Sequence, residues 1–122
     1  MYIFYSHPVS VFNTELEIQD LVLIGRCFPR AIVVNPNSPE HNLQYKEKGM
    51  VHFLDKIRFC DILVFRATPE GKITAGVMKE IQTAKAYNLP ILELPYVADR
   101  GLTVEETREY LIQVGARQRE TE

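Results

Sequence analysis

A chain of 122 residues suits a single domain, and we expect one domain over residues 1–122. With 46% hydrophobic and 25% charged residues, it can bury an ordinary core beneath a charged surface. The formal net charge of -2 excludes the basic excess that a general nucleic-acid-binding surface needs, so we expect no nucleic-acid polymer as partner. No apolar run reaches the length of a membrane span, so no membrane partner is expected either.

The two cysteines, Cys27 and Cys60, are fewer than a secreted scaffold of this size usually carries. We therefore interpret both as reduced thiols of a cytoplasmic protein. Together with the three histidines they show no metal-ligand spacing, so neither a metal nor a cofactor is expected.

In the first half of the chain, short apolar runs alternate with helical patterns. Residues 2–5 form an aromatic and β-branched strand that stops at Pro8. Next comes a helix, ended by Pro29, whose apolar positions are Leu16, Leu21, Ile24 and Phe28. Residues 31–34 are a continuous apolar run, typical of a strand buried on both faces of a parallel sheet.

The second half continues the alternation. We predict a short polar helix over 40–48 and a strand over 61–65. Between them a helix runs from Met50 to about Arg58, because the apolar Met50, Phe53, Leu54 and Ile57 recur at helical spacing. A loop leads to a helix over 74–87 that Asn88 closes, and a strand follows over 91–94. Thr103 and Glu106 form a capping box that opens a last helix, and residues 117–122 are a frayed tail.

This alternation predicts the fold class. Strands that alternate with helices build a mostly parallel sheet with helices on both faces and right-handed crossovers. We expect a three-layer α/β/α sandwich with a four- to five-stranded Rossmann-like (flavodoxin-like) sheet.

In such sheets a ligand binds beyond the carboxyl ends of the strands, near the point where the strand order reverses. The loops there follow the four strands, and the loop over 66–74 is the richest because it ends at a helix N-terminus that favours an anion. We take as candidate substrate-binding residues Tyr5, Ser6, His7, Asn35, Thr74 and Gly76. For Tyr5 a place in the core, and for His7 an exposed turn, are the more ordinary interpretations.

Glu80 follows Gly76 by four residues, so both lie on one face of the helix. It also borders the apolar stripe that contains Val77 and Ala84. A carboxylate there is partly desolvated and close to the expected site. On position alone, the more frequent role of such a residue is a solvated acid on the helix surface.

Several of these segments resemble the nucleoside 2-deoxyribosyltransferase-like superfamily, which includes deoxyribonucleoside-monophosphate N-glycosidases. The likeness lies in the strand that opens with Asp61, in the Gly76-to-Glu80 spacing followed by Ala84, and in the Leu89-Pro90 step. The layout agrees over the whole chain, and the specific motifs cover about a third of it.

The resemblance implies a catalytic site. Glu80 matches the family nucleophile, which attacks the anomeric carbon, and Asp61 matches the acid that helps the base to leave. The catalytic hypothesis requires Glu80 and Asp61 to face one cleft. On position alone Asp61 is more simply a turn or cap residue, because the start of a strand usually points away from a site at the strand ends. Thr74 falls where phosphate-preferring members carry a hydroxyl. Because family members build sites at subunit contacts, the resemblance also allows a homodimer.

Three hypotheses follow for the function. The first is an enzyme that cleaves or transfers the N-glycosidic bond of a small nucleoside or nucleotide. The second is a non-catalytic nucleotide-binding or sensing module that uses the same pocket. The third is a structural or partner-binding domain, because a fold alone does not establish a reaction.

Overall fold

The structure is a computed structural model that describes residues 1–94, apart from the side chains at positions 42, 44 and 45. Its strands are β1 (Tyr2–Ser6), β2 (Ile32–Val34), β3 (Ile62–Phe65) and β4 (Ile91–Glu93). Its helices are the 3₁₀ turn η1 (Val9–Val11), α1 (Glu15–Cys27), α2 (Pro39–Lys48), α3 (Met50–Arg58) and α4 (Ala75–Ala86). The predicted loop over 95–101, the last helix and the tail lie outside the described residues.

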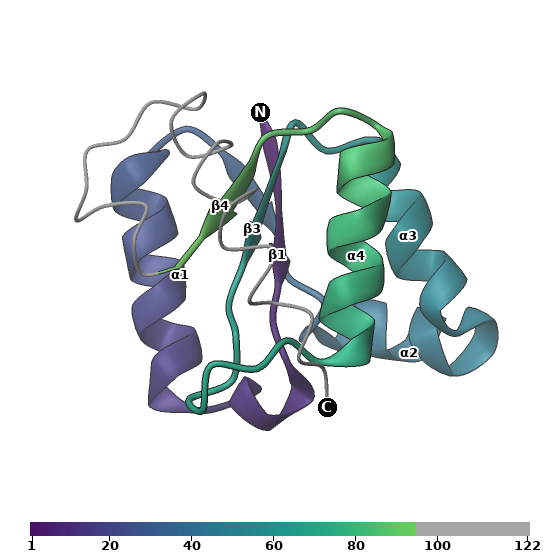
Figure 1. Cartoon of the computed structure of the whole chain (residues 1–122), viewed down its shortest axis with the longest axis horizontal. Coiled ribbons are helices and arrows are strands. Elements are labelled where there is room, and N and C mark those ends of the chain that lie inside the picture. Colours follow the sequence, from purple (N-terminus) through teal and green to yellow (C-terminus); the bar gives the residue numbers. More distant parts are fainter. Residues whose placement is uncertain (95–122) are drawn as a thin grey trace.

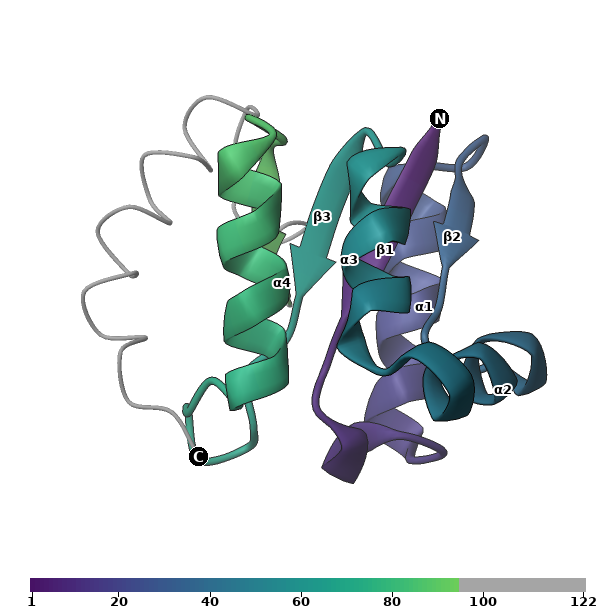
Figure 2. The same cartoon turned by 90° about the vertical axis from the view of Figure 1, so that its right-hand side faces the viewer.

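The sheet is parallel throughout, with the strand order β2-β1-β3-β4. The α1 helix covers one face of the sheet, and α3 and α4 cover the other (Figures 1 and 2). The prediction of a three-layer sandwich with a mostly parallel sheet is therefore confirmed. The chain runs outward from β1 to β2 and then returns to the far side of β1, so the strand order reverses between β1 and β3.

Each face of the sheet carries its own core. On one side, buried residues of α3 and α4, such as Ile57 and Ile81, pack with Phe4. On the other side, Ile24 of α1 packs with a set that contains Ile3 and Tyr5. Successive residues of a strand point to opposite faces, and β1 shows this alternation directly. Ser6 therefore shares the face of Phe4, on the side of α4.

The ends of two helical segments depend on local backbone chemistry. Pro8 precedes η1, where the Val11 N–H donates to the Pro8 carbonyl at 2.9 Å. We did not predict this turn, because three residues are too few to show a helical period. At the other end of the described chain, Asn88 takes the left-handed conformation (φ +58°) just after α4. The prediction that Asn88 closes this helix is confirmed.

Candidate functional site

A pocket of about 570 Å³ opens at the carboxyl ends of the strands, beside the point where the strand order reverses. Its walls come from the segment after β1, the loop after β2 and the N-terminal parts of α3 and α4. The lining residues are His7, Pro8, Val9, Ser10, Phe12, Pro36, Met50, Phe53, Thr74, Gly76, Val77 and Glu80. The volume lies in the range that small-molecule sites occupy. The position that fold topology predicts for a ligand therefore holds a real cavity.

Glu80 is the carboxylate of this pocket, and only 5% of its surface is exposed. The Ser6 hydroxyl donates a hydrogen bond of 2.6 Å to its Oε1 atom. Within the described part of the chain, Oε2 has no hydrogen-bond partner. Burial raises the pKa of Glu80 to about 7, and the bond from Ser6 opposes that rise. Glu80 is therefore a nearly buried pocket carboxylate rather than a solvated surface acid.

Removing the Ser6 hydroxyl is expected to raise the pKa of Glu80 above its value of about 7, because this bond is the contact that favours the charged form. A carbon-13 titration of labelled glutamate carboxyls in Ser6→Ala measures the change, and Glu80→Gln identifies the resonance. The control is Ser10→Ala, since Ser10 lines the pocket without bonding Glu80. If the titration midpoint of Glu80 is the same in Ser6→Ala as in the wild type, this hydrogen bond is ruled out.

The N-terminus of α4 forms the wall next to Glu80. The Thr74 side chain caps the helix by accepting from the Val77 N–H at 3.4 Å. The Ala75 and Gly76 N–H groups fall in the first turn, where an α-helix offers no internal acceptor. Thr74 and Gly76 both line the pocket, as the sequence indicated.

Gly76 leaves room at this wall, because a Cβ atom there would lie 4.0 Å from the Met50 side chain, an ordinary contact. We expect Gly76→Ala to stabilise the fold by up to about 1 kcal/mol through helix propensity, while its methyl group narrows the pocket and weakens ligand binding. Urea unfolding and ligand titration measure the two effects. The control is Gly25→Ala on α1, which has open space around it and should change stability alone. Unchanged ligand binding in Gly76→Ala would show that the ligand does not approach this turn.

His7 lies at the pocket, but its ring is fully buried. The side chain has no exposed surface, and the ring stacks on Tyr5 with centroids 3.8 Å apart. Its Nδ1 atom lies 3.1 Å from the Tyr5 carbonyl oxygen, and its Nε2 atom lies 2.8 Å from the Glu17 carboxylate. Burial lowers the pKa of His7, and the bond to Glu17 offsets part of that effect. His7 therefore shapes the pocket without offering its ring to a ligand.

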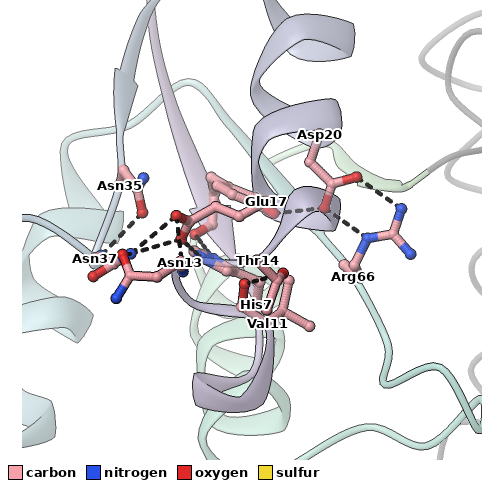
Figure 3. A network of polar contacts seen from close by, with 10 residues as sticks. His7, Val11, Asn13, Thr14, Glu17, Asp20, Asn35, Asn37 and Arg66 are labelled. Carbon is pink, nitrogen blue, oxygen red and sulfur yellow. Dashed lines mark hydrogen bonds and ion pairs between the residues drawn. The ribbon is translucent and has the colours of Figure 1, made fainter.

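The structure turns Tyr5 away from the pocket. Its hydroxyl donates to Asp20 at 2.5 Å on the α1 side of the sheet. Arg66 makes two further bonds to the same carboxylate, at 2.6 and 2.7 Å (Figure 3). The prediction that Tyr5 contacts the substrate is therefore wrong, and the core interpretation is correct.

Asn35 and Asp61 also lie apart from the pocket lining. The Asn35 side chain accepts from the Asn37 N–H at 2.9 Å, which shapes the loop after β2 and leaves Pro36 to line the pocket. Asp61 is exposed and accepts from the Tyr2 N–H at 2.7 Å, where β1 begins. Because β1 and β3 are parallel, Asp61 lies at the amino ends of the strands, whereas the pocket opens at their carboxyl ends. The expected pairing of Asp61 with Glu80 is therefore wrong.

The sequence did not single out several residues that build the site. Phe12 and Pro36 line it, and so do Met50 and Phe53, which the helical pattern had assigned only to packing. Glu17 was also missed, although it lies three residues before Asp20 and seven before Ile24. All three are buried in α1. The signal in the sequence is that Glu17 precedes two predicted apolar positions, Leu21 by four residues and Ile24 by seven, which places it on the same face.

Among residues 1–94, no three or more histidine, cysteine or acidic side chains form a group suited to a metal ion. Both cysteines are free thiols, and burial raises the pKa of Cys60 to about 11. No helix in this part of the chain is long and apolar enough to cross a membrane.

No protein-family model matches the chain, and no curated protein matches its sequence.

Proposed function

We propose that this protein cleaves or transfers the N-glycosidic bond of a small nucleoside or nucleotide, with Glu80 as the nucleophile. The observation that carries the proposal is a nearly buried carboxylate with one oxygen held by Ser6 and the other unpartnered in the described structure, in a pocket of ligand size. The resemblance of the Gly76-to-Glu80 segment to the nucleoside 2-deoxyribosyltransferase-like superfamily supports the choice of substrate.

The proposed step uses Oε2 of Glu80. It attacks the anomeric carbon, the carbon–nitrogen bond breaks, and its electron pair leaves with the base. The sugar is then an ester of Glu80. Attack by water at the anomeric carbon restores the carboxylate and gives hydrolysis, whereas attack by a second base gives transfer.

Asp61 does not share the cleft of Glu80, so the two-carboxylate mechanism that the resemblance implied fails, and the proposal rests on Glu80 alone. Among the described residues that line the pocket, Glu80 is the one carboxylate, so the leaving base takes its proton from water. The pKa of Glu80 sets the working range, because attack requires the ionised form. The reaction rate is accordingly expected to rise with pH through about 7.

The rest of the pocket suits a nucleoside or its monophosphate. Phe12 and Phe53 supply apolar aromatic surface for a base. The first turn of α4 supplies N–H groups that favour a phosphate, and it lies beside Glu80 in the same pocket. A ligand with an apolar base, a sugar and an anionic end would use all three features.

A non-catalytic nucleotide-binding module is the second candidate. It is favoured by the lack of a second carboxylate among the described lining residues, since most glycosidases use two. In this case Glu80 would accept hydrogen bonds from the ligand without forming an ester.

Base release separates these candidates. The protein is incubated with a panel of deoxynucleosides and their monophosphates, and free base is measured by chromatography. Release that disappears in Glu80→Ala supports the enzyme. Thermal stabilisation by a nucleotide without release of base supports the binding module. If neither is seen, both proposals for the pocket fail and a structural role is favoured.

A further inference from the structure

Glu17 gathers three separate segments around its carboxylate, although only 7% of its surface is exposed. It accepts from His7 Nε2 at 2.8 Å and from the Asn13 N–H at 3.2 Å. The Asn37 amide donates to both of its oxygens, at 3.0 and 2.9 Å (Figure 3). A single side chain of α1 thus holds the end of β1, the turn before α1 and the loop after β2.

These segments supply one whole wall of the pocket. Pro8 and Phe12 lie between His7 and Asn13, and Pro36 precedes Asn37. Phe12 also packs on the His7 ring, with centroids 4.7 Å apart. Asn13 itself adopts φ +60°, a left-handed conformation that asparagine takes more readily than most other non-glycine residues. Glu17 does not line the pocket, so it acts on the wall only through its hydrogen-bond partners.

The wall formed by α3 and α4 is anchored differently. Thr74, Gly76 and Glu80 belong to α4 or its cap, and α4 is held by the apolar core it shares with α3. Within the part of the chain that the structure describes, no hydrogen bond or ion pair joins Glu17 to this wall. The pocket therefore has a wall set by α3 and α4 and a wall set by Glu17.

We propose that Glu17 is a positioning residue, which fixes the wall formed by residues 8–12 and Pro36 at the distance that a ligand needs from Glu80. Only the expected change in KM rests on the proposed function. Its structural consequence holds for any ligand of the pocket.

Glu17→Gln is the sharpest variant, because it keeps the shape and removes the charge. Whichever way the new amide is turned, its NH₂ group faces a donor: the Asn37 amide on one side, or the Asn13 N–H as well on the other. The matched control is Asp20→Asn, three residues along the same helix. Asp20 also loses its charge and meets the donors of Arg66, but it bonds no lining residue directly and reaches His7 only through the ring of Tyr5.

Two measurements test the proposal. Backbone amide shifts of the ligand-free protein should change in Glu17→Gln at Val9, Ser10 and Asn37, and stay near wild type at Gly76 and Glu80. If base is released, KM for the deoxynucleoside monophosphate should rise by about tenfold, with kcat and the pH midpoint within twofold of wild type. Asp20→Asn should leave KM unchanged.

The outcomes divide cleanly. Shifts that spread equally to α4, a changed kcat with constant KM, or the same rise of KM in Asp20→Asn would overturn the positioning role. A wild-type protein that releases no base would defeat the proposed function, while the amide shifts would still decide this inference. Should Glu17→Gln fail to fold, Asn37→Ala removes the loop's bonds to Glu17 and should move the same amides.

Discussion

Replacing Glu80 by glutamine is expected to abolish base release. Glutamine retains the bond from the Ser6 hydroxyl but has no carboxylate to attack the anomeric carbon. Loss of a catalytic nucleophile lowers kcat by on the order of 10⁴-fold or more. Chromatography of released base over long incubations measures the residual rate.

Nucleotide binding separates a catalytic effect from a collapsed pocket. Glu80→Gln should still be stabilised thermally by the deoxynucleoside monophosphate that the wild type cleaves, because its shape is unchanged. Base release within tenfold of the wild-type rate would show that Glu80 is not the nucleophile.

The same substitution is expected to stabilise the fold at alkaline pH. The pKa of Glu80 is about 7 in the folded protein against an ordinary 4.5, so the folded state holds its proton more tightly than the unfolded state. Stability from this group is therefore complete below about pH 4.5 and is lost as the pH rises through 7. Above pH 7 the charged carboxylate costs the fold about 3 kcal/mol, which glutamine does not.

Urea unfolding of both proteins at pH 5 and at pH 8.5 measures this difference. The gain in Glu80→Gln should be small at pH 5 and near its full value at pH 8.5. Burial lowers the pKa values of His7, His41 and His52, which favours the fold at higher pH. That opposite trend is shared by both proteins, so it cancels in the comparison.

Glu70 provides a control for this experiment, because it is an exposed acid in the loop before α4. Glu70→Gln should change the free energy of unfolding by less than about 0.5 kcal/mol at either pH. If Glu80→Gln is no more stable than wild type at pH 8.5, Glu80 is not desolvated as the structure has it. A Glu80→Gln protein that is more stable but inactive is the result expected when a functional group is kept at a cost to the stability of the fold.

The layout of the fold could be predicted because each element carries a strong local pattern. The apolar runs that became β2 and β3 are bounded by turn residues, and the periodic Met50, Phe53 and Ile57 became α3. The Rossmann-like order then placed the pocket at the carboxyl ends of the strands. Those ends do hold Ser6, Thr74 and Gly76 around Glu80.

The face of the sheet to which each side chain of β1 points could not be predicted in the same way. A strand buried on both faces lacks the polar alternation that shows which side chains point where. Tyr5 and Ser6 were therefore both candidates, and only the packing on α1 and α4 separates them.

Asp61 shows a different source of error. Because Asp61 comes directly before β3, the sequence already placed it at the amino ends of the strands, away from the ligand loops. We nevertheless assigned it to the site because of the family resemblance. In the structure its carboxylate instead binds the start of β1. A residue at the start of a strand needs direct evidence before it is assigned to a site at the strand ends.

The most direct test of Glu80 as the nucleophile is to trap the sugar on it. A deoxynucleoside monophosphate with a fluorine beside the anomeric carbon slows hydrolysis of the ester, so that the adduct survives acid quenching, proteolysis and mass spectrometry. We predict one sugar on the peptide that contains Glu80, and none in Glu80→Gln. Release of base by the wild type with no sugar on Glu80, or with the sugar on another residue, would contradict the assignment.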